Sequence, residues 1–321
     1  MSNSSFRDSS WRQTAMRAVI VTVGIIIIAG SGGGGVSLLP EWDGIGGSPP
    51  APLPTPLRVT VAPSRLVVQA GETARFTAST RVGSTYQWRR DGVDIAGATG
   101  SSYTLTGANV GDDNAQFTVV VHNSGETATA TGVLRVSPLP AVVFEDTEFA
   151  MPDWSASVLA APPPGGPTVT VSQQLGYRRI VYEMPSWPTS VRIPVVHAWL
   201  RSTYDPAVRG AILVLDYRQE CIALEDRGLS FLHARLMLEQ GGRVFMTSKD
   251  PWCYREWGSS SLDAQRADEF IALDGTPGSP DFSANGAPIR FGFITEAEIA
   301  PSVSEPISQG VDNWKVTVWR K

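Results

Sequence analysis

The sequence predicts an all-β protein because three observations agree. Apolar and polar residues alternate with the two-residue period of β-strands through most of residues 57–321. No stretch of several turns sustains the apolar period of an amphipathic helix. The 31 glycines and 24 prolines are dispersed between the alternating runs, which is typical of loop-rich β proteins rather than of disordered chains.

The segment that precedes this region has the layout of an export signal. Residues 17–35 read RAVIVTVGIIIIAGSGGGG, with an arginine, an apolar centre and a small-residue exit. The centre is shorter than the ~20 residues that a membrane span needs. We therefore predict a cleaved signal peptide over residues 1–31, with an uncleaved membrane anchor as the alternative. Ser31 stands where a lipoprotein signal carries cysteine, so lipidation has no acceptor there.

The predicted location is the periplasm, cell surface or extracellular space of a bacterium. Residues 32–56 are predicted to be a linker, because a run of glycines is flexible and a run of alternating prolines is extended. The net charge of −5 is mild and no basic block occurs, so nucleic acid is not an expected partner. Membrane contact is expected only through the N-terminal segment, if that segment stays uncleaved.

The two cysteines, Cys221 and Cys253, are predicted to form a disulfide. An even cysteine count in an exported chain favours pairing, and two free buried thiols are the alternative. The bond would close a loop over residues 221–253. Closing a loop of this length contributes ~3–4 kcal/mol to the free energy of unfolding through loop entropy.

Residues 57–138 are predicted to be the first domain, a sandwich of short strands. An Asp-Gly pair at residues 91–92 marks a hairpin turn within it. The expected strands are residues 57–61, 74–78, 86–88, 102–105, 116–121 and 128–136.

The string TYQWRRDGVDIAGATGSSYTLTGANVGDDNAQFTVVVHNSG within this domain resembles a bacterial immunoglobulin-like domain. The resemblance implies that Trp88 is the core tryptophan. It also implies that Asp113 and Phe117 belong to the family's corner motif, although Phe117 lacks the usual tyrosine hydroxyl. Ala78 and Val119 stand where the family places its inter-sheet disulfide. The resemblance indicates a fold and no activity.

Residues 139–321 are predicted to be a second domain, a two-sheet jelly roll. Residues 229–238 alternate throughout, which favours a long strand over a helix. The strings FEDTEF, EWGSSSLDAQRADEFIAL, DFSANGAPIRFGFIT and GVDNWKVTV resemble concanavalin-like or galactose-binding-like carbohydrate-binding modules of secreted bacterial proteins. The expected strands are residues 141–144, 178–183, 191–200, 211–217, 229–238, 243–246, 270–273, 289–294 and 314–318.

A structural calcium site is predicted where the first and last strands of this domain meet. Glu145 and Asp146 lie near one end of the domain sequence and Asp312 near the other. Carboxylate oxygens at such a junction suit Ca²⁺, and the resemblance implies calcium there. The alternative is a set of solvated acidic side chains. No cofactor for catalysis is expected.

Aromatic side chains are the candidate ligand contacts. Trp252 and Tyr254 flank Cys253, and Trp187 and Tyr204 lie near proline-containing turns. Flat rings on a disulfide-pinned loop suit stacking on sugar rings, because aromatic side chains are amphipathic. The alternative is packing in the core, and Trp257 is expected to be buried in this way.

No catalytic signature occurs, so an exported, non-catalytic binding protein is predicted. There is no G-x-S-x-G elbow, H-E-x-x-H motif, P-loop or dinucleotide fingerprint. Carbohydrate recognition by residues 139–321 is the expected function. A structural or adhesive protein-interaction module of the cell envelope or matrix is the alternative, and a hydrolase using acids such as Glu220, Glu225 or Asp226 is less favoured. The three histidines are expected to be a turn residue and two strand residues, namely His122, His197 and His233.

Overall fold

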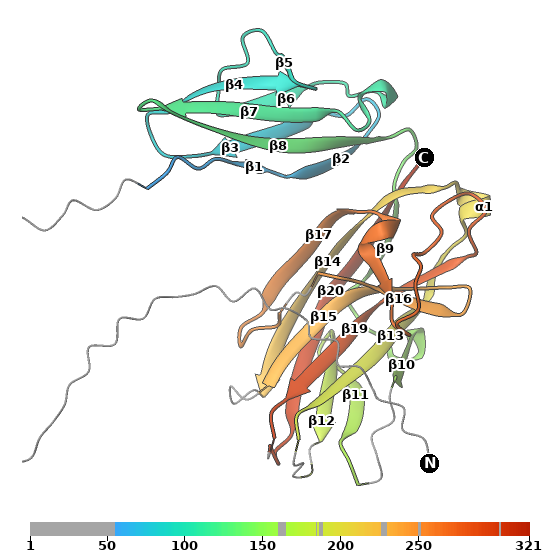
Figure 1. Ribbon diagram of the computed structural model, residues 1–321. Helices are drawn as coiled ribbons and strands as arrows, with labels where there is room; N and C mark the ends of the chain where they lie inside the picture. The colour runs from blue at the N-terminus through green and yellow to red at the C-terminus, as the bar shows by residue number, and fades with distance from the viewer. Residues whose placement is uncertain are drawn as a thin grey trace, which may run out of the picture. The chain divides into compact units, whose positions relative to one another are not determined.

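The computed structural model describes residues 55–159, 165–183, 185, 189–225, 230–249, 252–301 and 303–321 (Figure 1). Residues Thr55–Lys321 belong to one compact unit. The predicted signal and nearly all of the predicted linker lie outside the described residues. Among the described residues, no helix is both long and apolar enough to cross a membrane.

The chain is all-β, as predicted, and its first group of strands forms two sheets. The five-stranded sheet has the order β2-β8-β7-β4-β5, and the three-stranded sheet has the order β1-β3-β6. The elements are β1 (Thr60–Ala62), β2 (Arg65–Gln69), β3 (Ala74–Ser79), β4 (Thr85–Arg90), β5 (Val93–Asp94), β6 (Ser102–Leu105), the 3₁₀ turn η1 (Val110–Asp112), β7 (Gln116–Asn123) and β8 (Glu126–Ser137).

The core between these two sheets is built on aromatic rings. Trp88 is fully buried and its indole N–H donates to the carbonyl of Gly100 at 3.0 Å. Phe117 stacks between Phe76 and Tyr103, with ring centroids 5.2 and 5.3 Å apart. Trp88 is thus the core tryptophan that the resemblance implied.

The corner motif of this group is held by a carboxylate instead of a tyrosine hydroxyl. Asp113 accepts hydrogen bonds from Nε of Arg135 at 2.8 Å and from the backbone N–H of Val136 at 3.0 Å. The positions of the missing inter-sheet disulfide are filled by Ala78 and Val119, both buried. Packing and the Asp113 contacts therefore stabilise this part of the chain.

The second group of strands forms two six-stranded sheets. One has the order β10-β13-β19-β15-β16-β18; the other has the order β11-β12-β20-β14-β17, with β9 also pairing with β20. The elements are β9 (Val142–Asp146), the 3₁₀ turn η2 (Met151–Asp153), β10 (Trp154–Val158), β11 (Thr168–Gln174), β12 (Tyr177–Glu183), β13 (Val191–Tyr204), α1 (Pro206–Arg209), β14 (Ile212–Glu225), β15 (Ser230–Gln240), β16 (Arg243–Thr247), β17 (Gly258–Gln265), the 3₁₀ turn η3 (Ala267–Glu269), β18 (Phe270–Ala272), β19 (Ile289–Ile299) and β20 (Ile307–Arg320).

Every second side chain along these strands points inward and fills the core of this sandwich. In β15, the inward residues Leu232, Ala234, Leu236 and Leu238 are buried in one hydrophobic cluster. The long strand predicted for residues 229–238 is therefore confirmed. The first and last strands lie side by side, because β9 pairs antiparallel with β20, as the jelly-roll interpretation required.

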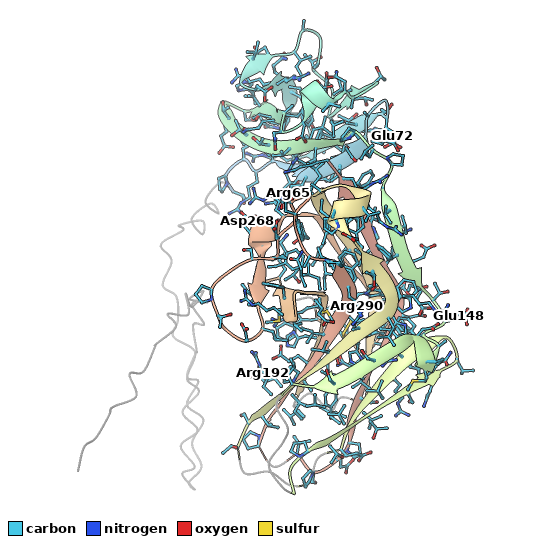
Figure 2. All side chains as sticks on the ribbon, turned by 90° about the vertical axis from the view of Figure 1, so that its right-hand side faces the viewer. Arg65, Glu72, Glu148, Arg192, Asp268 and Arg290 are labelled. Atoms are coloured by element: carbon cyan, nitrogen blue, oxygen red, sulfur yellow. A yellow bond between two sulfur atoms is a disulfide. The ribbon has the colours of Figure 1, made fainter. Side chains whose placement is uncertain are left out.

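Contacts between β2 and the second group of strands join the two groups within the compact unit. One guanidinium nitrogen of Arg65 lies 2.7 Å from both carboxylate oxygens of Glu269, and Figure 2 shows Arg65 near the η3 turn. Val67 packs in a small apolar cluster with Val214 and Ala264. Ion pairing and apolar packing therefore both act at this contact.

A chain of buried polar side chains crosses the core of the second group. Nε of Arg178 donates to Nδ1 of His197 at 3.0 Å, which leaves the ring proton on Nε2, 2.9 Å from the hydroxyl oxygen of Thr295. The hydroxyl of Tyr182 donates to Thr295 at 3.2 Å and accepts from Gln309 at 2.8 Å. His197 is thus a satisfied strand histidine, as predicted. Burial, and then the charge of Arg178, hold its pKa well below 6.5.

Because His197 is buried with a lowered pKa, we expect the protein to lose stability on mild acidification. Below about pH 6.5, His197 binds a proton in the unfolded chain but not in the folded protein, where its pKa is lower. The free energy of unfolding therefore falls by ~1.4 kcal/mol per pH unit until the pH reaches the pKa of His197 in the folded protein. Urea unfolding between about pH 7.5 and 5.5 measures this slope. We expect His197→Gln to flatten it, whereas His122→Gln, at an exposed position, leaves it unchanged. An equal slope in His197→Gln would contradict the assignment.

Candidate functional site

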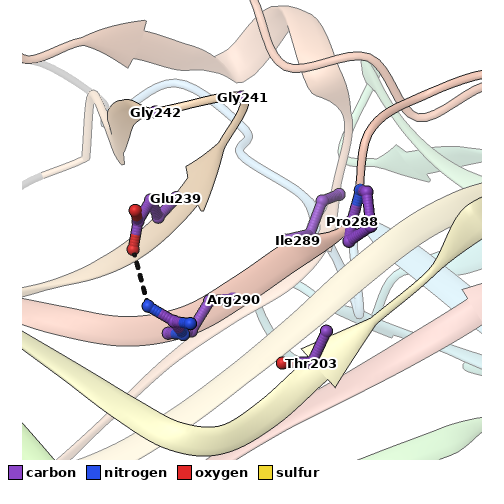
Figure 3. A pocket seen from close by; sticks show the side chains of 7 residues that line it. All are labelled: Thr203, Glu239, Gly241, Gly242, Pro288, Ile289 and Arg290. Atoms are coloured by element: carbon purple, nitrogen blue, oxygen red, sulfur yellow. Dashed lines mark hydrogen bonds and ion pairs between the residues drawn. The ribbon is translucent and has the colours of Figure 1, made fainter.

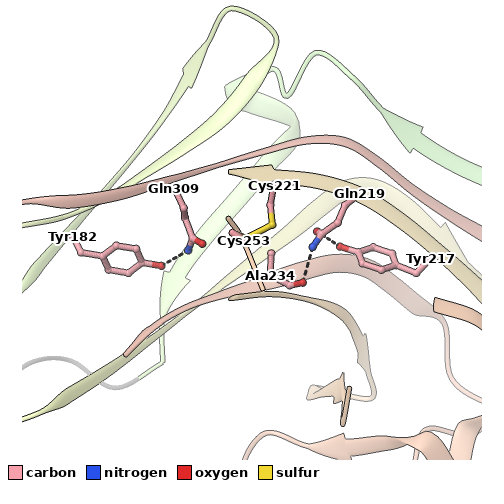
Figure 4. The surroundings of a disulfide bond; sticks show 7 residues. All are labelled: Tyr182, Tyr217, Gln219, Cys221, Ala234, Cys253 and Gln309. Atoms are coloured by element: carbon pink, nitrogen blue, oxygen red, sulfur yellow. Dashed lines mark hydrogen bonds between the residues drawn. A yellow bond between two sulfur atoms is a disulfide. The ribbon is translucent and has the colours of Figure 1, made fainter. Parts of the chain in front are cut away.

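The disulfide lies inside the second sandwich and anchors a segment that passes from one sheet to the other. Cys221 of β14 is bonded to Cys253, with Cα atoms 5.2 Å apart, so the predicted disulfide is confirmed. Figure 4 shows the bond between strands of the two sheets, flanked by buried polar side chains. The N–H of Cys253 donates to the carbonyl of Leu232 in β15, whereas the carbonyl of Tyr254 accepts from Ala223 in β14. Consecutive residues therefore bond to opposite sheets.

Because of this crossing, the aromatic residues around Cys253 are divided between two faces. Trp252 is 45% exposed and its ring lies 4.7 Å from the ring of His233, on the β15 side. Tyr254 and Trp257 follow on the β14 side and are 68% and 42% exposed. The expectation that Trp257 is buried is therefore wrong. Trp257 precedes the edge strand β17 and lies on the outer face of its sheet.

A glycine makes room for the indole of Trp257 on that face. A Cβ atom at Gly310 of β20 would lie 3.1 Å from Cη2 of Trp257 and 3.0 Å from side-chain carbons of Tyr177 and Ile222. The indole therefore extends from β17 over the neighbouring strands. The rings of Trp257 and Tyr177 lie 5.5 Å apart at 75°. We call this pair the aromatic corner.

A polar hollow of ≈ 290 Å³ lies on the same sheet. Glu220 is opposite Asp312 in β20 and opposite Ser259 in β17. On β14 and β20 the core-facing residues Cys221 and Val311 are buried, so their neighbours face outward with the aromatic corner. The hollow is lined by Arg218, Gln219, Glu220, Ser259, Ser260, Ser261, Asn313 and Lys315.

Two carboxylates in this region are held in place. Glu220 accepts from the hydroxyl of Ser259 at 3.2 Å and from the side-chain amide of Asn313 at 3.0 Å. Asp312 accepts from the backbone N–H of Asn313 at 2.6 Å. Partial burial raises the pKa of Asp312, and the nearby charges of Glu220 and Glu148 raise it further. The face thus presents fixed acceptors beside two aromatic rings.

The residues predicted to bind calcium have other partners. Glu145 forms an ion pair with Lys315 at 3.1 Å. Asp146 accepts from the indole N–H of Trp154 at 2.6 Å and from two backbone N–H groups. In the part of the chain that the structure describes, no three metal-ligating side chains gather closely enough to hold an ion. Calcium binding with Asp312 stays a prediction.

Trp252, on the β15 side, and Tyr204 are not part of this face. Tyr204 is fully buried and its hydroxyl donates to the carbonyl of Gly210 at 2.6 Å. Assigning it to ligand binding is therefore wrong, because it ends β13 facing the core and fixes the α1 turn. Trp187 lies outside the described residues. Asp226 and the side chain of Glu225, weighed as catalytic acids, also lie outside them.

The other six-stranded sheet has hollows of a different kind. The one in Figure 3 has a volume of ≈ 200 Å³ and contains the ion pair of Glu239 with Arg290 at 3.2 Å. A larger one of ≈ 480 Å³ is lined by Leu159, Pro194, Gly242, Arg243, Val244, Leu273 and Asp274. None of the three linings, that of the polar hollow included, contains an aromatic ring, but the polar hollow lies on the same sheet face as the aromatic corner. The candidate site for a stacking ligand is therefore the aromatic corner with its polar hollow.

The chain has only distant similarity to known proteins. No family model and no curated protein matches it. The N-terminal four immunoglobulin domains of Dscam1 isoform 7.44 are 25% identical over 25% of this chain, with a TM-score of 0.24. This chain spans 21% of that Dscam1 structure. The CBM22-1 xylan-binding domain of Paenibacillus barcinonensis Xyn10C is 8% identical, with 56% of this chain and 94% of that domain covered and a TM-score of 0.28. No family is assigned on these values.

Proposed function

We propose that this protein is an exported, non-catalytic binding protein that recognises carbohydrate at the aromatic corner and the adjoining polar hollow. The observation that carries the proposal is the half-exposed indole of Trp257, held over Gly310 beside fixed hydrogen-bond acceptors. The apolar face of a sugar ring packs on such an indole. Its hydroxyls donate to carboxylates such as Glu220, and a few placed polar groups of this kind give a pocket its specificity.

Two features support export. The Cys221–Cys253 disulfide fits an oxidising compartment, and the N-terminal segment has the layout of a signal. In this proposal the immunoglobulin-like strands act as a spacer or interaction module. As a spacer, these strands hold the binding face away from the N-terminal segment, where the protein is either attached to the membrane or released by cleavage.

Replacing Trp257 by alanine tests the location of the site. We expect ~10-fold or greater loss of affinity, because a buried aromatic contact at the centre of an interface carries much of the binding energy. A glycan array with Ca²⁺ in the buffer would find a ligand for the full chain, and calorimetry would compare variants. Trp252→Ala is the matched control, since Trp252 is similarly exposed but lies beside β15.

Two results would contradict this proposal. If Trp252→Ala weakens binding and Trp257→Ala does not, the site lies on the other sheet. If no glycan binds, carbohydrate recognition is excluded, and the structural or adhesive role becomes the better proposal. One observation favours that second role: β11 is the last strand of its sheet among the described residues, and a free strand edge can pair with a partner chain.

A further inference from the structure

We propose that the sugar recognised at the aromatic corner carries a positive charge, as an amino sugar with a free ammonium group does. This inference rests on the proposed function and names the ligand class for the same site. Two observations support it. The first is which charged side chains around the polar hollow already have a partner, and the second is where the aromatic corner lies relative to Glu220 and Asp312.

The acidic groups of the face have no basic partner within the described part of the chain. Glu220 accepts only from the neutral groups of Ser259 and Asn313. Asp312 accepts from a backbone N–H. The two carboxylates belong to residues directly opposite each other on β14 and β20, and like charges placed opposite each other are destabilising. A bound cation between them relieves that repulsion.

The basic groups nearby already have partners. Arg179 lies opposite Gly310 of β20, beside the aromatic corner, and its guanidinium donates to the hydroxyl of Ser308 at 3.4 Å. Arg218 forms an ion pair with Asp263 at 3.0 Å, and Lys315 pairs with Glu145 at 3.1 Å. Their charges are therefore balanced locally and do not neutralise Glu220 or Asp312. Glu220 and Asp312 are therefore the carboxylates that a positive charge on the ligand would balance, and a uronic acid or a sulfated sugar is the less favoured ligand.

The aromatic corner favours the same charge. The faces of Trp and Tyr rings attract an ammonium group, most strongly when the cation contacts more than one ring. The Trp257 and Tyr177 rings meet at 75°, so a group in the corner contacts both. Glu220 lies two residues along β14, or roughly 7 Å, from Ile222, whose side chain borders the same space over Gly310 as the indole. A pyranose stacked on Trp257 spans that distance and places its amino group toward the carboxylates.

The test uses matched oligosaccharides that differ only in acetylation. Calorimetry on the full chain compares a glucosamine tetramer, which is cationic below neutral pH, with an N-acetylglucosamine tetramer and with cellotetraose, both neutral. We expect the glucosamine tetramer to bind about tenfold more tightly or better. The preference should shrink as salt rises from about 50 to 500 mM, because salt screens charges at an exposed site.

Variants separate the two carboxylates from the rest of the face. Glu220→Gln and Asp312→Asn keep the size and an acceptor oxygen of each side chain, and each should reduce the preference for the amine several-fold while affinity for cellotetraose stays. Glu239→Gln is the matched control, because Glu239 pairs with Arg290 on the other six-stranded sheet, and it should keep the preference. Thermal unfolding of each variant confirms that it is folded.

The outcomes distinguish this inference from the proposed function. Equal affinity for the amine and the N-acetyl tetramer, with binding still dependent on Trp257, overturns the charge inference and leaves carbohydrate recognition intact. A preference that salt and both carboxylate variants leave unchanged also overturns it. Absence of binding to every oligosaccharide overturns both.

Discussion

Replacing Gly292 by alanine is expected to lower the free energy of unfolding by more than about 4 kcal/mol. Gly292 lies in the middle of the central strand β19, opposite Ala198 of β13. A Cβ atom there would overlap the backbone carbonyl oxygen of His197. The carbonyl of Gly292 also accepts from the indole N–H of buried Trp314 at 3.4 Å. The alanine can be accommodated only by separating β13 from β19, which opens the core.

Urea unfolding followed by tryptophan fluorescence measures this effect. Gly258→Ala is the matched control, because Gly258 begins an edge strand of the same sandwich and a methyl group there would meet nothing closer than 3.9 Å. We expect a change within about 1 kcal/mol for this control. A Gly292→Ala protein that unfolds at the wild-type urea concentration would show that β13 and β19 are spaced differently from this description.

Removing the disulfide is expected to cost ~2–5 kcal/mol of unfolding free energy. Cys221 and Cys253 are both buried in the main apolar cluster, so the bond joins strands of two sheets from inside rather than closing a surface loop. The double variant Cys221→Ala, Cys253→Ala loses this constraint. A double serine variant should lose a further ~1–3 kcal/mol for each hydroxyl left without a partner.

Chemical denaturation with and without a reductant checks the same prediction. Reduction should destabilise the wild-type protein and leave the double alanine variant unchanged. The intact mass of protein recovered from an exporting host provides an independent result, since two free thiols there would contradict the bond. A wild-type protein whose stability does not respond to complete reduction would contradict the expected energy.

The strands that sequence alone identified are those whose alternation reflects burial on one face. β3 and β12 belong to this class, because buried and more exposed residues alternate along both. β17 was missed because its sequence, GSSSLDAQ, contains few apolar residues, as an edge strand permits. β11 was missed for a similar reason, since it is half exposed along its length. Apolar and polar residues alternate when one face of a strand is buried and the other faces solvent. The two faces of these edge strands differ little in burial, so their sequences alternate weakly.

The aromatic residues show why the candidate site was only partly predictable. Tyr204 was placed at the surface because of nearby proline, yet its position in β13 points it to the core. Trp257 was placed in the core, yet Gly310 lets it extend over an outer face. Gly310 lies 53 residues further along the chain, and only strand register brings the two together. Likewise, no local pattern indicates that Glu220 and Asp312 are opposite each other.

The position of β20 has a consequence for biosynthesis. This strand pairs with β9, β12 and β14, so the last of the described strands lies at the centre of its sheet. While residues 307–320 are still inside the ribosome, β12 and β14 have no strand between them and β9 has no partner. Long-range pairings of this kind form late in folding. The second sandwich therefore completes its fold only once residues 307–320 have left the ribosome.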